Sequence, residues 1–235
     1  MCEEIKDEES VAKEIERILV DAWNNFLDYY KKKAPEYREN WPVKPKDKKQ
    51  AEKGAKESHW ICWDEYDLMF HIGRIFYDKL RQKGKEFSNI EIHFEKNVNP
   101  TNFEGYVFES KFPKLKENLG GKYPIVDMIA AYEDKNFPFL LCAELKYIHC
   151  AQNKPEKTIE ADIKKLEVIG ECEIAQRLVF ILFDDYYYYK RGQRTAKKIK
   201  KLLDKIKEGK KDIITVLDST SEEKLPQHLK DWLRS

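Results

Sequence analysis

The chain has 235 residues, of which 41% are hydrophobic and 37% are charged. This length predicts one large domain or one domain with extensions, and the apolar content excludes wholesale disorder. Lys and Arg number 44 and Asp and Glu number 43, so the net charge of +1 excludes a uniformly polybasic protein.

No apolar run approaches the roughly 18 residues of a membrane span. The N-terminal segment MCEEIKDEES is acidic and lacks an apolar signal region. We therefore expect a cytoplasmic protein with no membrane partner. The five cysteines include no C-x-x-C pair, so neither a disulfide framework nor a zinc knuckle is expected. Reduced thiols that are mostly buried are the prediction.

The first predicted helix covers residues 10–33, and Pro35 disfavours its continuation. Residues 34–58 hold three prolines and many charges, which is typical of a linker. The predicted division is an amphipathic helix in 1–33, a charged linker in 34–58 and a main domain in 59–235, with the helix as an appendage. The apolar residues of this helix recur at helical spacing: Val11, Ile15, Ile18, Leu19, Ala22, Trp23, Phe26, Leu27 and Tyr30.

The main domain begins with a predicted helix over 62–82, which has an apolar stripe at helical spacing. Apolar and polar residues alternate in 89–98, which predicts a half-buried strand. Residues 99–121 are expected to be irregular. Strands follow at 123–132 and 138–148, and the segment EDKN between them suits a hairpin turn.

A helix is predicted over 155–169, beginning at a proline in a favoured first position. The segment RLVFILF at 177–183 predicts a buried strand, which is followed by a basic helix over 191–207, a strand at 212–217 and a short helix around 225–233. The hairpin requires antiparallel pairing, and the later strand–helix–strand units require parallel crossovers. The expected fold is therefore α/β, with a mixed sheet flanked by helices.

Three ionisable residues lie in two strands that are otherwise apolar. Asp127 lies in the first, and Glu144 and Lys146 lie two residues apart in the second, within LLCAELKY. Residues two apart on a strand point to the same face. Because an unpaired buried charge is costly, these groups need partners. The partners are either one another, in a structural ion-pair cluster, or a metal ion.

An acid, a hairpin turn and a Glu-x-Lys strand, with helices before and after, resemble the PD-(D/E)XK nuclease superfamily and its restriction-endonuclease-like fold. The matching segments are Pro124–Asp127 and Glu144–Lys146, within a span of about 60–218. Proline stands three residues before Asp127 rather than next to it. The resemblance implies an α-β-β-β-α-β core with an added N-terminal helix. It also implies a Mg²⁺-dependent nuclease, with Mn²⁺ as a substitute, and DNA as the favoured substrate because the superfamily mostly cuts DNA.

The resemblance further implies roles for the site residues. Asp127 and Glu144 would bind the metal, with the backbone carbonyl of Leu145 as a third ligand, and Mg²⁺ prefers such oxygen ligands. Lys146 would orient the attacking water and stabilise the developing negative charge. A lysine beside two carboxylates should stay protonated, so its predicted role is electrostatic.

The superfamily often adds an acid from the helix that precedes the sheet. The candidates are Asp64, Glu65 and Asp67, and Glu65 is our choice as an assisting catalytic residue because its spacing places it on the inward stripe. Acids near a helix N-terminus also complement the helix dipole, so that interpretation stays open.

Positive charge concentrates in residues 190–211, which hold eleven Lys or Arg and two Asp or Glu. Such a helix can track phosphates, or it can be a solvated face. Tyr186–Tyr189 could stack on bases but are better explained by packing at a strand end. Asp162 and Lys165 are interpreted as a surface i,i+3 pair. The residues predicted to bind nucleic acid are Lys190, Arg191, Arg194, Lys197, Lys198 and Lys201.

Two alternatives to an enzyme stay open. One is a catalytically inactive nucleic-acid-binding module on the same fold. The other is an accessory protein that docks through its N-terminal helix on a partner or on a second copy. A homodimer is also left open, because restriction-type enzymes often dimerise to cut both strands. No G-x-x-x-x-G-K-[ST] loop occurs in the sequence, so no nucleotide cofactor is expected.

Overall fold

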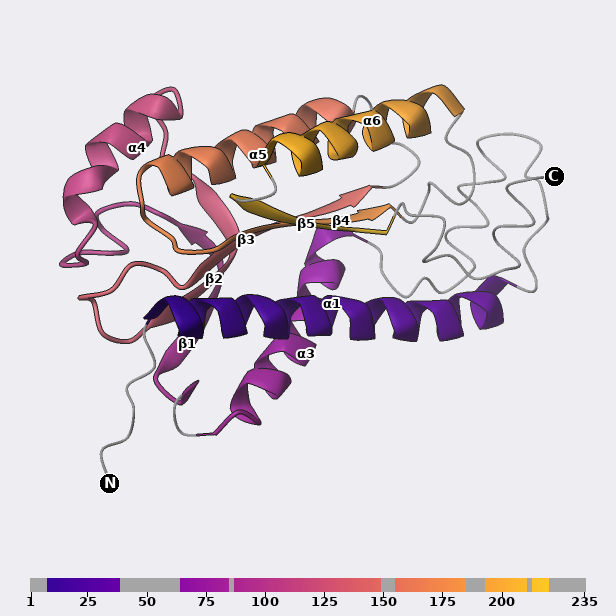
Figure 1. Cartoon of the computed structure of the whole chain (residues 1–235), viewed down its shortest axis with the longest axis horizontal. Helices are drawn as coiled ribbons and strands as arrows, with labels where there is room; N and C mark the ends of the chain where they lie inside the picture. Colours follow the sequence, from indigo (N-terminus) through magenta and orange to yellow (C-terminus); the bar gives the residue numbers. More distant parts are fainter. Residues whose placement is uncertain are drawn as a thin grey trace.

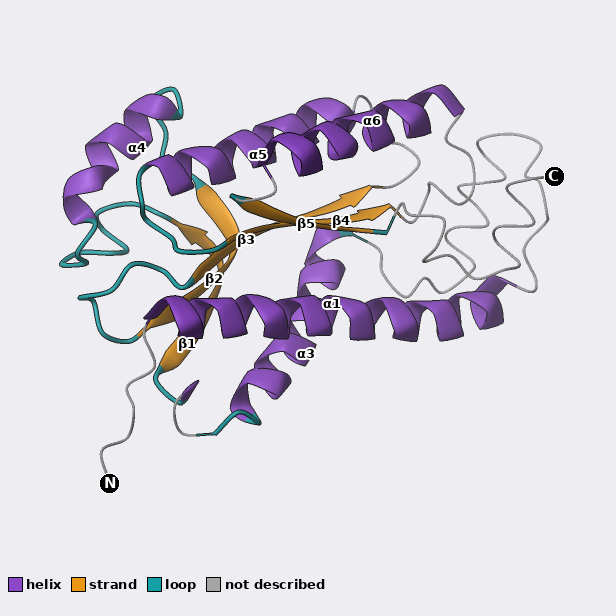
Figure 2. Ribbon diagram, viewed as in Figure 1, coloured by secondary structure: helices purple, strands orange, loops and turns teal. Residues whose placement is uncertain are grey.

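The computed structural model describes residues 8–38, 64–84, 87–148, 155–184, 193–210 and 213–219. These segments form three layers, with a central sheet between two layers of helices (Figure 1). Figure 2 shows α1 and α3 on one side of the sheet and α4, α5 and α6 on the other. The expected α/β class is therefore confirmed.

The sheet has five strands in the order β1-β2-β3-β4-β5. The first three strands pair antiparallel, whereas β3, β4 and β5 pair parallel. The mixed pairing predicted from the hairpin and the crossovers is thus confirmed. The strands are β1 (Ile90–Asn97), β2 (Ile125–Tyr132), β3 (Leu141–Ile148), β4 (Leu178–Asp184) and β5 (Ile214–Asp218).

The helix α1 (Glu8–Arg38) is an integral part of the domain. Its buried stripe shares one hydrophobic core with α3 (Glu65–Arg81) and with the underside of the sheet. Phe26 lies edge-on to Phe183 of β4, with 5.2 Å between ring centroids. The expectation that this helix is an appendage is therefore wrong. The predicted end of this helix at residue 33 is also wrong, because α1 continues through Pro35. The bias against helical backbone before a proline is only a preference.

The other face of the sheet is covered by α5 (Pro155–Glu171) and α6 (Gln193–Lys210), which are the two parallel crossovers. The segment expected to be irregular contains a 3₁₀ turn (Glu109–Lys111) and α4 (Phe112–Asn118). This expectation failed because seven residues are too few to show a helical period. Proline at the second helical position and two buried residues, Phe112 and Leu115, hold α4 in place.

Two cysteines lie in the described parts of the chain. Cys142 and Cys172 are both free and buried, as predicted. Within the same segments, no helix has the length and apolar character needed to cross a membrane. The linker residues 39–58, the tyrosines at 186–189 and the helix expected around 225–233 lie outside the described residues.

Candidate active site

The strands β2 and β3 separate at the point where the acidic residues occur. The last pair of their ladder is Met128 with Ala143, whereas β2 stays paired with β1 as far as Ile125. Beyond the last pair, the backbone amide of Leu145 donates to Asp127 Oδ2 over 2.7 Å. The Asp127 carboxylate therefore accepts the hydrogen bond of an amide that would have bonded to a β2 carbonyl if the ladder had continued.

Glu144 points from β3 toward α5 and is only 1% exposed. Its Oε2 lies 2.5 Å from the Lys165 ammonium nitrogen, which also donates to the carbonyl of Ile125 over 2.9 Å. The Oε1 atom of Glu144 is buried and has no hydrogen-bond partner among the described residues. Buried polar atoms are normally paired, so this oxygen is free to accept a hydrogen bond or to contact a cation.

Lys146 is held between two helices. Its Nζ atom lies 2.9 and 3.2 Å from the two carboxylate oxygens of Glu65, at the start of α3. Asp162 of α5 lies 3.3 Å away on the other side. Glu65 also accepts a 3.3 Å hydrogen bond from the backbone amide of Tyr147. Its carboxylate therefore fixes both the lysine and the strand end beyond Leu145.

The candidate acids at the start of α3 make different contacts in the structure. Asp64 is the N-cap residue and accepts a hydrogen bond from the amide of Asp67, which is the role expected of a capping aspartate. Glu65, one residue on, reaches Lys146. Of the three candidate acids, Glu65, which was selected for its inward spacing, is thus the one that contacts the cluster.

Asp162 and Lys165 were not predicted to belong to this cluster. They do form an ion pair, with 3.7 Å between charged atoms, but their side chains are only 15% and 21% exposed, so the surface interpretation is wrong. Asp162 lies three residues after Ile159 and four before Leu166, two buried residues of α5. That spacing places it beside the inward stripe, and it is the sequence signal that could have identified it.

Burial dominates the ionisation of the two central acids. It raises the pKa of Asp127 to about 6, although the hydrogen bond from Leu145 and the charge of Lys165 act in the opposite direction. Burial, reinforced by the charge of Asp127, raises the pKa of Glu144 well above its usual value. Both carboxylates are therefore held in a setting that favours added positive charge.

The two lysines of the cluster keep their charge although they are largely buried. Burial disfavours the charge of Lys146, but Asp162 and Glu65 outweigh it and its pKa is raised. Burial likewise acts against Lys165, and Glu144 and Asp162 outweigh it. Both lysines are therefore ammonium ions at neutral pH, as expected for Lys146.

The cluster holds more acid than base. Four carboxylates (Glu65, Asp127, Glu144 and Asp162) meet two ammonium groups, so full ionisation leaves two negative charges uncompensated. Within the described segments, no set of three His, Cys, Asp or Glu side chains is arranged to hold a metal. Mg²⁺, however, is commonly bound by one or two carboxylates, with water and substrate phosphate completing its shell.

A divalent cation fits the cluster on both counts. It would supply the missing charge, and it would give Glu144 Oε1 the partner that it lacks. Asp127 and Glu144 would be its protein ligands. The Leu145 carbonyl stays a predicted third ligand.

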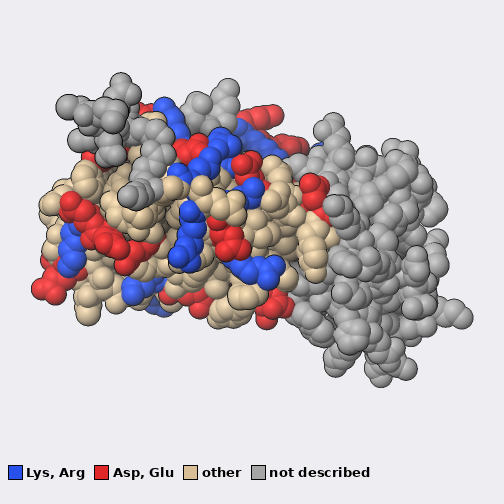
Figure 3. Space-filling model, turned by 90° about the horizontal axis from the view of Figure 1, so that it is seen from below, with Lys and Arg blue, Asp and Glu red and all other residues tan. Residues whose placement is uncertain are grey.

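The basic helix is described in part. Its described side chains begin at Lys198, which is exposed and lies 3.8 Å from Glu156, and Lys201 is exposed as well. Lys207 instead binds the buried Asp218 of β5 over 2.5 Å. The other four residues predicted to bind nucleic acid (Lys190, Arg191, Arg194 and Lys197) lie outside the described side chains. Figure 3 shows the α1 side of the molecule, where acidic and basic residues are interspersed.

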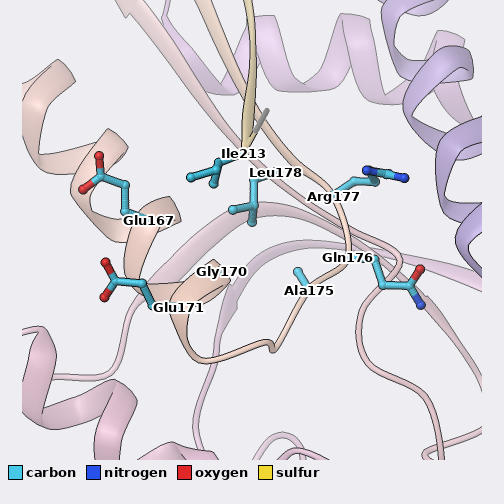
Figure 4. A pocket seen from close by; sticks show the side chains of 8 residues that line it. All are labelled: Glu167, Gly170, Glu171, Ala175, Gln176, Arg177, Leu178 and Ile213. Atoms are coloured by element: carbon cyan, nitrogen blue, oxygen red, sulfur yellow. The ribbon is translucent and has the colours of Figure 1, made fainter. Parts of the chain in front are cut away.

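A hollow lies at the end of the sheet where β4 and β5 begin. Figure 4 shows Glu167 and Glu171 on one side of it and Arg177 directed away from them. Arg177 instead contacts Glu9 and Glu16 of α1. Ligand sites of open α/β sheets lie at the carboxyl ends of the parallel strands, and this hollow lies at their amino ends, so its position does not favour it as a ligand site.

The chain matches no protein-family model, and it has no significant match among curated proteins or among solved structures. The function of this chain is therefore inferred from the chemistry of the site, because a fold alone does not fix a function.

Proposed function

We propose that this chain is a Mg²⁺-dependent nuclease that hydrolyses phosphodiester bonds of nucleic acid, with DNA as the expected substrate. The observation that carries the proposal is the charge imbalance around Asp127 and Glu144, together with the unpartnered oxygen of Glu144. The missing positive charge is that of one divalent cation. A cation held by two carboxylates with open coordination positions is the arrangement that phosphoryl chemistry uses.

Each residue of the cluster has a task in this proposal. Bound Mg²⁺ would supply charge neutralisation at the phosphate and a water of lowered pKa. Lys146 would hold its ammonium group toward the phosphate, where negative charge grows in the transition state. Glu65 and Asp162 contact Lys146 from two helices, so they are positioning residues. Lys165 neutralises part of the charge of Glu144.

The order of elements supports the proposed membership of the PD-(D/E)XK superfamily. A helix precedes three antiparallel strands, and a helix and two parallel strands with a second crossover follow. The acid occurs in the second strand and the Glu-x-Lys run in the third. The core that the resemblance implies has the order α-β-β-β-α-β, and the elements from α3 to β4 are compatible with it, with α1 before them, α4 inserted and α6 and β5 after them.

A non-enzymatic nucleic-acid-binding module is the second candidate. It is favoured by the contact of Lys165 with Glu144, because an ammonium group already takes a place that a cation would share. In that case the cluster would be structural, and the exposed lysines of α6 would bind phosphates. Binding would then depend steeply on salt and would not depend on Mg²⁺.

Calorimetric titration with Mn²⁺ and a cleavage assay on DNA and RNA test the proposal. Wild-type protein should bind Mn²⁺, and Glu144→Ala should lose that binding. Lys146→Ala should lose cleavage while folding and nucleic-acid binding stay largely intact. Lys164→Ala is the matched control, because this neighbouring lysine of α5 is exposed and lies 3.9 Å from Glu167. Undiminished cleavage by Lys146→Ala would refute the site assignment, and Mg²⁺-independent binding without any cleavage would favour the binding module.

A further inference from the structure

An apolar groove lies between α3 and β1, next to the candidate active site. Its volume is about 430 Å³. The residues that line it come from the outer side of α3 and from two positions of β1: Tyr66, Met69, Phe70, Gly73, Arg74, Tyr77, Ile92 and Phe94. Tyr66 directly follows Glu65, whose carboxylate holds Lys146, so one end of the groove adjoins the cluster.

The groove gathers four of the five exposed aromatic side chains of the described residues. Eight large apolar side chains are exposed among the described residues, and four of them are aromatic residues that line this groove: Tyr66, Phe70, Tyr77 and Phe94. Phe70 is the most exposed of all, at 64%. Single exposed apolar residues need no explanation, but a contiguous patch marks a binding surface.

A glycine shapes the floor of the groove. An added Cβ at Gly73 would lie 2.6 Å from the ring of Phe94, so the ring lies directly against the helix backbone. The ring of Phe94 is nevertheless 42% exposed. Gly73 thus lets the tip of the Phe94 ring approach the helix backbone, at a position where a larger residue would push the ring away.

The groove has a basic part and an acidic end. At that end Tyr66 hydrogen-bonds Glu95 and lies near the charges of Asp64 and Glu65, whereas the part around Phe70 and Tyr77 carries arginine and suits an anionic ligand with flat apolar parts. Arg74 carries the only charge among the described lining residues, and its guanidinium lies 5.9 Å from the ring centroid of Phe70. Arg81, two turns beyond Arg74, lies 5.4 Å from the ring centroid of Tyr77. Exposed aromatic rings interleaved with arginine are the means by which proteins bind unpaired bases and the adjoining phosphates.

We propose that this groove binds the unpaired bases of a single nucleic-acid strand and leads that strand to the cluster around Glu144. The inference rests on the proposed nuclease function, and it names the substrate class of that site as single-stranded or locally unpaired nucleic acid. Bases stack on Phe70, Tyr77 and Phe94, and Arg74 contacts the backbone. An intact duplex cannot offer its bases in this way, because they are stacked on one another.

The test is fluorescence anisotropy with the full chain in EDTA, where cleavage cannot occur. The probes are a labelled oligothymidylate of about 20 nucleotides, an oligouridylate of equal length and a duplex of equal length, a size that exceeds typical single-strand sites. Wild type should bind the single strands more tightly than the duplex. Phe70→Ala should weaken single-strand binding about 5- to 150-fold, the usual worth of one stacking contact, and leave the slope against salt unchanged. Arg74→Gln should reduce that slope by about 0.7.

Two variants keep the test clear of folding effects. Ile213→Ala removes an exposed apolar side chain at the other end of the sheet and should bind like wild type. Gly73→Ala should displace Phe94 and weaken single-strand binding, while thermal stability stays equal or rises because alanine favours a helix over glycine.

The failure of this inference differs from the failure of the proposed function. Equal single-strand affinity of Phe70→Ala and wild type, with cleavage still lost in Glu144→Ala, overturns the groove and leaves the nuclease in place. A dimer in sedimentation that Phe70→Ala dissociates, without any change in single-strand affinity, also overturns it in favour of a second copy as the occupant. Loss of affinity in Phe70→Ala alongside no metal binding supports the groove and refutes the nuclease.

Discussion

The substitution Asp127→Asn should stabilise the metal-free protein at neutral pH. Asp127 is largely buried, and its pKa rises from 3.8 to about 6. A folded-state pKa above the unfolded one means that the folded chain binds the proton more tightly, so stability is lost as the pH rises from about 4 to 6. At about 1.4 kcal/mol for each pH unit, the ionised carboxylate costs the folded state about 2–3 kcal/mol above pH 6.

Asparagine removes this cost without losing the local structure. Its amide oxygen can still accept the hydrogen bond that Leu145 donates to Asp127. In urea denaturation with EDTA at pH 7.5, the variant should therefore be about 2–3 kcal/mol more stable than wild type, and the difference should vanish near pH 4. Mn²⁺ should reverse the order, because a ligand that binds only the folded state stabilises it by mass action and the variant lacks a ligand.

Three results would contradict this reasoning. A variant that is no more stable than wild type at pH 7.5 in EDTA would mean that Asp127 is well satisfied as an anion, and therefore that the cluster does not lack positive charge. A stability gain that persists unchanged at pH 4 would mean that it comes from packing rather than from ionisation. Equal stabilisation of both proteins by Mn²⁺ would place any metal elsewhere.

Three further substitutions test the fold and the cluster. Trp23→Ala should cost about 3–5 kcal/mol in urea denaturation, as for other buried tryptophans, because this α1 side chain is fully buried, whereas an appended helix would lose little. Glu14→Gln should lower the free energy of unfolding by about 1 kcal/mol at pH 7. A hydrogen bond from Arg17 is the main reason that the pKa of Glu14 falls to about 2. The difference in stability should therefore shrink as the pH falls from 5 toward 2. Lys165→Met should cost about 3–5 kcal/mol at pH 8 in EDTA, because it leaves the buried Glu144 without its ion pair, and acid should lessen the loss.

The sequence revealed those parts of the fold that depend on local pattern. The strands predicted at 89–98 and 177–183, from alternating and continuous apolar residues, correspond to β1 and β4, and each end differs by one residue. The hairpin and the crossovers then required a mixed sheet. The pair Asp127 and Glu144 could be found because an acid inside an apolar strand conflicts with its surroundings, and such a conflict is visible without a structure.

What the sequence hid depends on contacts between distant elements. Lys165 looks like half of a surface pair until α5 is placed over β3, where its ammonium group reaches Glu144. Likewise, α3 carries a second apolar stripe through Tyr66, Phe70 and Tyr77, which lies beside its buried residues. Only the buried stripe was predicted from the sequence, because a single stripe already explains a helix that packs on a core.

The backbone around the cluster argues against a purely structural role. A sheet that served stability alone would keep β2 and β3 paired as far as Ile125, which β1 still pairs with. Instead, the amides of Leu145 and Tyr147 donate to the carboxylates of Asp127 and Glu65. Exchanging ladder bonds for buried acids costs desolvation, and two lysines neutralise only two of the four carboxylates. One added divalent cation would offset that imbalance, as the proposed metal-dependent active site requires.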